Sequence, residues 1–114
     1  MATITPTMTV VPGGKARLYQ WTLGTGDDGA PIEAVEFADR SVQVSGTFGG
    51  ASVLVEGSND SSAYGTLTDP QGNDLSIIAS KVEMVTEVTR LIRPRVSGGS
   101  GVSVTVSLLA RFSA

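Results

Sequence analysis

The sequence contains neither cysteine nor histidine among its 114 residues. Without cysteine the fold has no disulfides and must depend on packing, helped by an oligomer interface or a larger assembly. The chain also cannot build Ser-His-Asp or Cys-His nucleophiles, or zinc sites made of thiolate or imidazole. A Ser-x-x-Lys dyad is missing, because Pro12 and Ile78 stand three residues before the two lysines. The composition therefore predicts a protein that is not an enzyme and has no cofactor.

Basic charge and long apolar runs are scarce as well. The net charge of -3 and the pI of about 4.7 leave no basic footprint for nucleic acid. No segment approaches the roughly 20 apolar residues of a membrane span, and the N-terminal stretch lacks the basic leader and apolar run of a signal peptide. We expect an intracellular product with no nucleic-acid partner and no membrane partner.

Glycine, valine, serine and threonine dominate what is present, a mix that favours strands and tight turns. Residues 102–112, VSVTVSLLARF, alternate apolar and polar side chains, which predicts a half-buried strand. Further strands are expected at residues 4–11, 16–23, 41–48, 51–57, 64–68, 74–80 and 89–96. The expected fold is all-β, a jelly-roll or Greek-key β-sandwich of about seven to eight short antiparallel strands. Residues 1–14 are expected to form an extended N-terminal arm, and residues 15–114 a single domain.

Three local features refine this expectation. Gly49 and Gly50 can both adopt positive φ and are expected to join two strands of a hairpin. Residues 81–86 carry valines at a spacing of three, which allows one helical turn there. Pro94 cannot donate a ladder hydrogen bond, so its strand is expected at a sheet edge or with a bulge.

Residues 55–75, VEGSNDSSAYGTLTDPQGNDL, raise the question of a bound ligand. Hard cations such as calcium take several oxygen ligands from loops, but the twelve-residue EF-hand spacing is absent. Asn and Asp also cap turns by accepting hydrogen bonds from nearby backbone N–H groups, and we favour this interpretation and predict no metal. The residues concerned are Asp27, Asp28, Asn59, Asp60, Asp69, Asn73 and Asp74.

Two sets of residues are candidates for a protein interface. Arg90, Arg93 and Arg95 form a positive cluster that could bind an acidic protein surface, or that only keeps an edge strand solvated. The N-terminal arm contributes a second, apolar set, Ile4, Met8 and Val10. Tyr19 and Trp21 share one strand face and could stack on a sugar or a partner, although Trp21 as ordinary core is the favoured interpretation.

The motifs VEGSND, LTDPQGN and IRPRV and the final alternating strand, all within residues 41–112, resemble the capsid decoration or cement proteins of tailed bacteriophages. This resemblance implies a jelly-roll sandwich on the capsid exterior, made in the bacterial host cytoplasm and acting as a dimer or trimer. Its implied function is structural: to bridge and stabilise major capsid protein subunits through non-covalent contacts.

Residues 53–67 also resemble part of the discoidin-like, galactose-binding β-sandwich modules, which carry a similar GSND turn. That resemblance implies an alternative function, a non-catalytic carbohydrate-binding module that uses Tyr64, Trp21 and the Asx-rich turns.

Overall fold

Alternating side chains along the long strands give each strand one apolar face, and two sheets bury these faces against each other. The computed structural model describes residues 2–112 and contains twelve strands in that range. They are β1 (Thr3–Ile4), β2 (Thr7–Val10), β3 (Ala16–Gly24), β4 (Asp28–Gly29), β5 (Ile32–Glu33), β6 (Phe37–Thr47), β7 (Ser52–Ser58), β8 (Gly65–Thr66), β9 (Ser76–Ile77), β10 (Lys81–Met84), β11 (Leu91–Ser97) and β12 (Ser103–Phe112).

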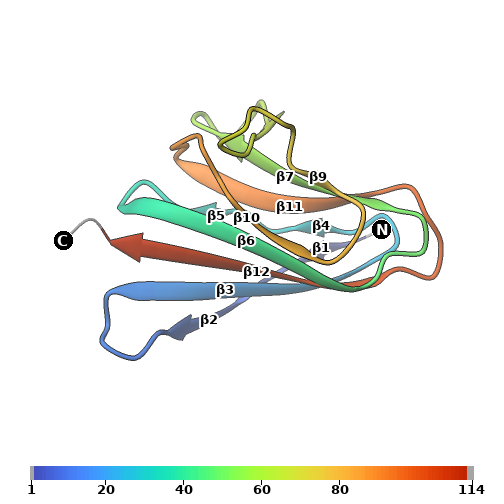
Figure 1. Cartoon of the computed structure of the whole chain (residues 1–114), viewed down its shortest axis with the longest axis horizontal. Helices are drawn as coiled ribbons and strands as arrows, with labels where there is room; N and C mark the ends of the chain where they lie inside the picture. The colour runs from blue at the N-terminus through green and yellow to red at the C-terminus, as the bar shows by residue number, and fades with distance from the viewer. Residues whose placement is uncertain (1, 113–114) are drawn as a thin grey trace.

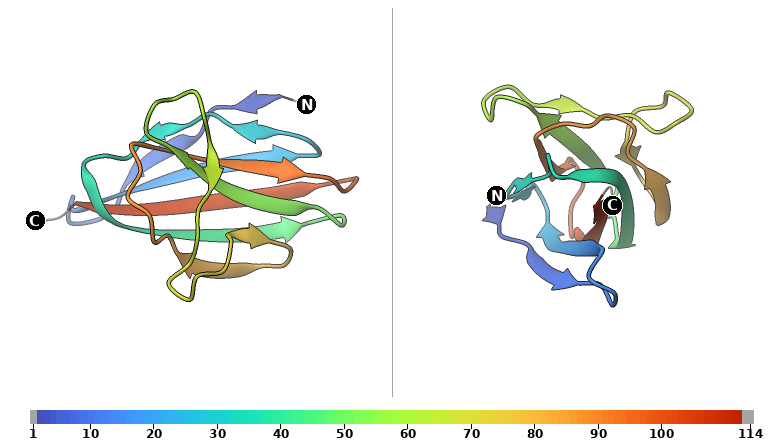
Figure 2. Two further views of the ribbon diagram at one scale, coloured as in Figure 1. Left: turned by 90° about the horizontal axis from the view of Figure 1, so that it is seen from above. Right: turned by 90° about the vertical axis from the view of Figure 1, so that its left-hand side faces the viewer.

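The strands form two sheets, which lie as separate layers in Figure 1 and in the view along the long axis in Figure 2. Sheet A has the order β1-β4-β11-β7-β8, with β5 also beside β11 and β9 also beside β7. Sheet B has the order β10-β6-β12-β3-β2. Every pairing between strands is antiparallel except that of β1 with β4. The predicted all-β, jelly-roll-like sandwich is confirmed, although the predicted seven or eight strands become twelve, several of which have only two residues.

The core lies between the sheets and follows the predicted alternation. On β12, Val104, Val106, Leu108 and Ala110 are buried, while the residues between them face outward. Trp21 is the largest buried side chain and is only 1% exposed. Valine, leucine, isoleucine and aromatic side chains make up most of this interior.

Two local predictions are wrong. Gly49 and Gly50 do adopt positive φ, but β6 belongs to sheet B and β7 to sheet A. The turn therefore carries the chain from one sheet to the other and closes no hairpin, as Figure 1 shows at the end where β6 continues into β7. Lys81–Met84 forms strand β10, paired with β6, in place of the helical turn. The β-branched Val82 and the open edge of sheet B outweigh the spacing of three.

The N-terminal stretch contributes one strand to each sheet. β1 pairs in parallel with β4, and β2 pairs antiparallel with β3. The predicted boundary between residues 14 and 15 falls in the turn between β2 and β3. Among residues 2–112, no helix is long and apolar enough to cross a membrane.

Candidate interaction surfaces

The predicted arginine cluster lies on the outer face of sheet A, and its members are already paired. Glu56 on β7 faces β11, where its two carboxylate oxygens accept hydrogen bonds from Arg93 Nε at 3.0 Å and Arg95 Nε at 3.1 Å. The Glu56 side chain is almost fully buried, whereas both arginines keep part of their surface in solvent. The Arg93 guanidinium also stacks over the Tyr64 ring, 3.9 Å from its centroid. Arg93 and Arg95 thus share one carboxylate, which offsets part of their positive charge.

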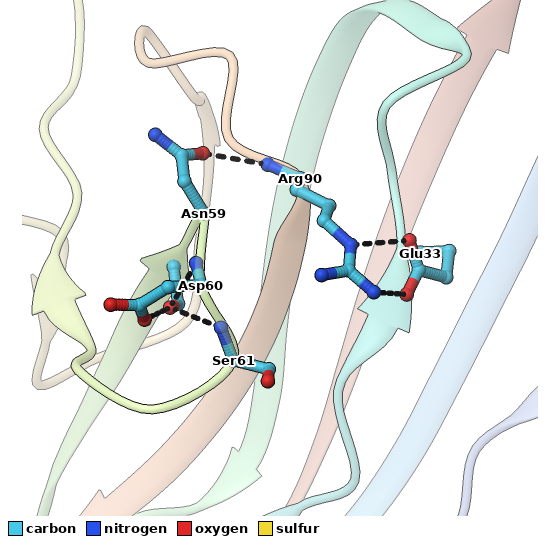
Figure 3. A network of polar contacts seen from close by, with 6 residues as sticks. Glu33, Asn59, Asp60, Ser61 and Arg90 are labelled. Atoms are coloured by element: carbon cyan, nitrogen blue, oxygen red, sulfur yellow. Dashed lines mark hydrogen bonds and ion pairs between the residues drawn. The ribbon is translucent and has the colours of Figure 1, made fainter.

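Arg90 has partners of its own, Glu33 and Asn59, which Figure 3 shows. Its guanidinium binds both carboxylate oxygens of Glu33 at 3.2 and 3.0 Å, and its backbone N–H donates to Asn59 Oδ1 at 3.0 Å. The hydrogen bonds and charge of Glu33 raise the pKa of Arg90 above its ordinary value. Each of the three arginines is therefore paired with a local carboxylate, and they do not form one open positive surface.

The edge position predicted for the arginine strand is wrong, because Pro94 is accommodated inside sheet A. β11 lies inside sheet A, and Pro94 pairs in register with Val55 of β7. Val96 N donates to Asp27 O on the opposite side, so by strand alternation the nitrogen of Pro94 also faces that side. There the neighbouring strand is interrupted between β4 and β5, and the register with β11 shifts by one residue. The irregularity expected from proline thus occurs in the neighbour.

The apolar N-terminal candidates differ in how they are placed. Ile4 on β1 is half-buried and packs against the core. Met8 and Val10 on β2 are about half exposed, at 52% and 50%. β2 forms one edge of sheet B, so both its apolar side chains and one row of its backbone groups face solvent.

The aromatic residues do not form a sugar platform. Trp21 is buried, and its Nε1 donates to Ala30 O at 3.0 Å. Tyr19 packs edge-on against Phe37, with ring centroids 6.2 Å apart. Tyr64 lies on the other sheet, with Arg93 over its ring. The favoured interpretation of Trp21 as core is confirmed, so Trp21 is not exposed for stacking on a sugar.

The Asx-rich turns use their own oxygens, as the turn interpretation predicted. Asp60 accepts hydrogen bonds from the backbone N–H groups of Ser62 and Ala63, and these bonds, with one from the Ser58 hydroxyl, lower the pKa of Asp60. Asp69 accepts hydrogen bonds from the backbone N–H groups of Gln71 and Asn73. The bond from Asn73 is the main reason that the pKa of Asp69 is lowered.

A metal site between the sheets does not fit the residues that line the interior. Transition metals and zinc take imidazole, thiolate or carboxylate ligands, whereas the interior positions here carry mainly aliphatic side chains. Within the described range, 2–112, no three carboxylate, imidazole or thiol residues are gathered closely enough to hold a metal ion.

A groove on the outer face of sheet B was not predicted from the sequence. Leu109 on β12, Ser41 on β6 and Met84 on β10 lie side by side across the sheet. Because Ser41 is small, a hollow opens between the two larger apolar side chains, and the ion pair of Arg111 with Asp39 closes one end. We call this the sheet B groove; it is lined by Asp39, Arg40, Ser41, Met84, Leu109 and Arg111.

Leu109 and Met84 are 40% and 49% exposed, and Val82 continues the apolar surface along β10. Sequence alternation placed Leu109 outward, but only the pairing of β10 with β6 brings it near Met84. The signal in the sequence was therefore limited to a leucine at a position where serine or threonine is the rule on that strand.

No family model and no curated protein matches this sequence. Among solved structures, the fold is similar to the SPBc2 prophage-derived protein YomS, with a TM-score of 0.64, 13% identity and coverage of 83% of this chain and 93% of that chain. It is also similar to a cupin domain from Bordetella pertussis Tohama I, with a TM-score of 0.54, 12% identity and coverage of 99% and 96%. A protein from Klebsiella pneumoniae with a double-stranded β-helix domain matches with a TM-score of 0.52, 14% identity and coverage of 96% and 75%.

These matches assign the sandwich to the cupin, or double-stranded β-helix, type of fold and contradict the resemblance to capsid decoration proteins and to discoidin-like modules. The physical reason is visible in the motifs that suggested them. VEGSND and LTDPQGN are turns in which Asp60 and Asp69 accept local backbone hydrogen bonds. Such turn chemistry is common to many β-sandwiches and does not distinguish one family from another.

Proposed function

We propose that this protein is a non-enzymatic structural component of a phage particle, which binds the major capsid protein through non-covalent contacts. In this proposal it is made in the bacterial host cytoplasm, attaches to the capsid exterior and acts as a homo-oligomer, a dimer or a trimer. The observation that carries the proposal is the sheet B groove, which leaves apolar side chains in solvent on a broad sheet face.

The groove has the composition of a protein-binding surface. Protein interfaces combine an apolar centre with a polar rim. Leu109 and Met84 form the apolar centre of the groove, and the ion pair of Arg111 with Asp39 forms part of its polar rim. Away from the groove, β6 and β12 carry serine, threonine and glutamine on this face, which keep that part polar. An apolar knob on a capsid subunit, flanked by charged groups, would fit this surface.

The similarity to a prophage-derived protein supports a phage context for this chain. That match spans 83% of this chain and 93% of YomS. An interior packed with aliphatic side chains supports a role in binding at the outer surface over one in catalysis between the sheets. Partner binding would also stabilise the folded chain by mass action, because only the folded form presents the groove.

Co-sedimentation with empty capsids of the phage or prophage that encodes the chain tests this proposal. The full chain is expected to bind at micromolar concentration. Leu109→Glu places a charge in the groove and is expected to weaken binding by about tenfold or more, as expected for the centre of an interface. No binding of the unchanged chain at micromolar concentration would contradict the proposal.

Val88→Glu is the matched control, because Val88 is also an exposed apolar residue but lies outside the groove. It adds the same charge and is expected to leave capsid binding within about twofold of the unchanged chain. Equal losses from both substitutions would show that net charge and not the groove determines binding.

A further inference from the structure

The two sheets end in edge strands that differ in their protection. An exposed, uncharged edge strand offers unpaired backbone groups to another chain, and proteins usually blunt such edges by shortness or charge. At the ends of sheet A, β1 and β8 have only two residues each. At one end of sheet B, β10 carries Lys81 and Glu83, whose side chains form an ion pair. At the other end, β2 has the sequence TMTV and no charge.

The backbone of β2 shows which groups are free for pairing. Val11 N donates to Ala16 O, in register with the pairing of β2 to β3. Because backbone groups alternate along an antiparallel strand, Thr7 and Thr9 also point their N–H and C=O groups toward β3. Met8 and Val10 therefore point theirs away from the sheet, and their side chains are the half-exposed apolar ones.

Prolines bound this free edge symmetrically. Pro6 and Pro12 lie at equal distances on either side of Thr9, and neither has an N–H to donate. A second strand can therefore pair fully only along the segment between them. If that strand is the same segment of another copy, centred on Thr9, then Pro6 lies opposite Pro12 of the other copy. No residue of the paired segment then faces a proline that lacks an N–H donor.

We propose that β2 pairs antiparallel with β2 of a second copy across a two-fold axis at Thr9, so that two sheets B become one continuous sheet. In this register Met8 lies opposite Val10 of the second copy, and each such pair exchanges both of its free backbone hydrogen bonds. The half-exposed apolar side chains then cover one another on one face of the sheet, and the two Thr9 side chains meet on the other.

The edge is symmetric about Thr9 in its prolines and its apolar residues and has no charge to repel an identical strand, which favours a second copy over a different partner. A two-fold contact of this kind uses the same patch on both subunits and closes at the dimer. The inference deepens the oligomer part of the proposed function by naming the dimer and its surface, and it does not depend on the capsid partner. Loss of capsid binding with an intact dimer would contradict only the proposed function.

Single cysteines in this cysteine-free chain test both the partner and the register. At the centre of the pairing, the Cα atoms of the two Thr9 residues would be about 4.5 Å apart, within the range of a disulfide. Thr9→Cys is therefore expected to give a disulfide-linked dimer on mild oxidation, seen by non-reducing electrophoresis. Thr7→Cys changes the same residue type on the same face of β2, but its two copies would be about 14 Å apart and should remain unlinked.

Sedimentation of the unchanged chain at tens of micromolar is expected to show a dimer. Val10→Lys should shift it to a monomer, because the added charge would lie in the apolar cluster, whereas Val82→Lys at the other edge of sheet B should leave the dimer intact. Mixing Val10→Lys with Met8→Glu should restore a heterodimer, since these positions face each other. A monomer or a trimer for the unchanged chain, or equal linking of Thr7→Cys and Thr9→Cys, would overturn the inference.

Discussion

Replacing Arg40 should destabilise the fold far more than replacing any surface arginine. Arg40 is an inward-facing residue of β6, only 3% exposed, and it has no carboxylate partner among residues 2–112. Its guanidinium instead donates to the backbone carbonyls of Ala34 at 2.5 Å and Phe37 at 3.4 Å, around the start of β6. It also donates to those of Glu87 and Thr89, both at 3.1 Å, in the segment before β11. One side chain thereby ties the turn before β6 to the segment before β11.

The size of the effect follows from the carbonyls that lose their donor. Ala34 O also accepts from Phe37 N, so it stays paired in Arg40→Met. Glu87 O and Thr89 O depend on the guanidinium. A fully buried acceptor left without a donor costs about 1–3 kcal/mol, and these two, which are partly buried, should each cost toward the lower end of that range. Against this, the change removes a buried charge whose Nε has no partner within the described residues and whose pKa is lowered by burial. The net loss expected for Arg40→Met is about 1–3 kcal/mol.

Urea unfolding of both chains, with a common slope, measures this difference directly. Arg111→Met is the matched control, because Arg111 is an exposed arginine on the neighbouring strand and its ion pair with Asp39 is largely solvated. Its expected loss is about 0–1 kcal/mol. If Arg40→Met were as stable as the unchanged chain, the carbonyls would be satisfied without the guanidinium and the reasoning would fail.

Two further perturbations test the packing of sheet A and the turn carboxylates. A Cβ at Gly29 would lie 2.5 Å from Pro94 Cδ and 2.8 Å from Trp21 Cδ1. Gly29→Ala should therefore lower the free energy of unfolding by about 1–3 kcal/mol in the same urea assay. Gly65 has open space around it, so the control Gly65→Ala should change the free energy of unfolding by less than about 0.5 kcal/mol. Burial opposes the charge of Glu87, but hydrogen bonds from Thr68 outweigh it and lower its pKa, as local hydrogen bonds do for Asp60 and Asp69. The lowered pKa values of these three carboxylates stabilise the fold above about pH 4, and this stabilisation is lost as the pH falls through the folded-state pKa values. The urea midpoint should therefore drop between about pH 5 and about pH 2.5, and a flat profile would refute this prediction.

The fold class was predictable because it depends on local alternation and turn chemistry. The β12 segment has one side-chain pattern and one plausible structure, and the Asp69 turn carries proline and glycine at favoured positions. The sheet to which each strand belongs was not predictable in the same way. Gly49 and Gly50 permit a hairpin and a crossing between sheets equally well, and only the long-range partners of β6 and β7 decide between them.

The candidate residues show the same division between local and long-range information. Sequence patterns found Arg93 and Arg95 on one face of a strand, and this is where they lie. They did not reveal Glu56, which comes from a strand more than thirty residues away and neutralises part of the cluster. The sheet B groove depends in the same way on β10 pairing with β6, which no local pattern encodes.

Together, these contacts distinguish sheet B, which has both an exposed apolar face and an uncharged edge, from sheet A. On the outer face of sheet A, the arginines are paired with Glu56 and Glu33, and the break opposite Pro94 leaves short strands at that side of the sheet. Sheet B has five strands in an unbroken order, with apolar side chains exposed on its face and an uncharged strand at its edge. Since a face and an edge do not compete for the same atoms, one copy can pair through β2 while its groove stays open. A dimer joined at β2 would then present two sheet B grooves related by the same two-fold axis, which is the arrangement needed to bridge two identical subunits of a larger shell.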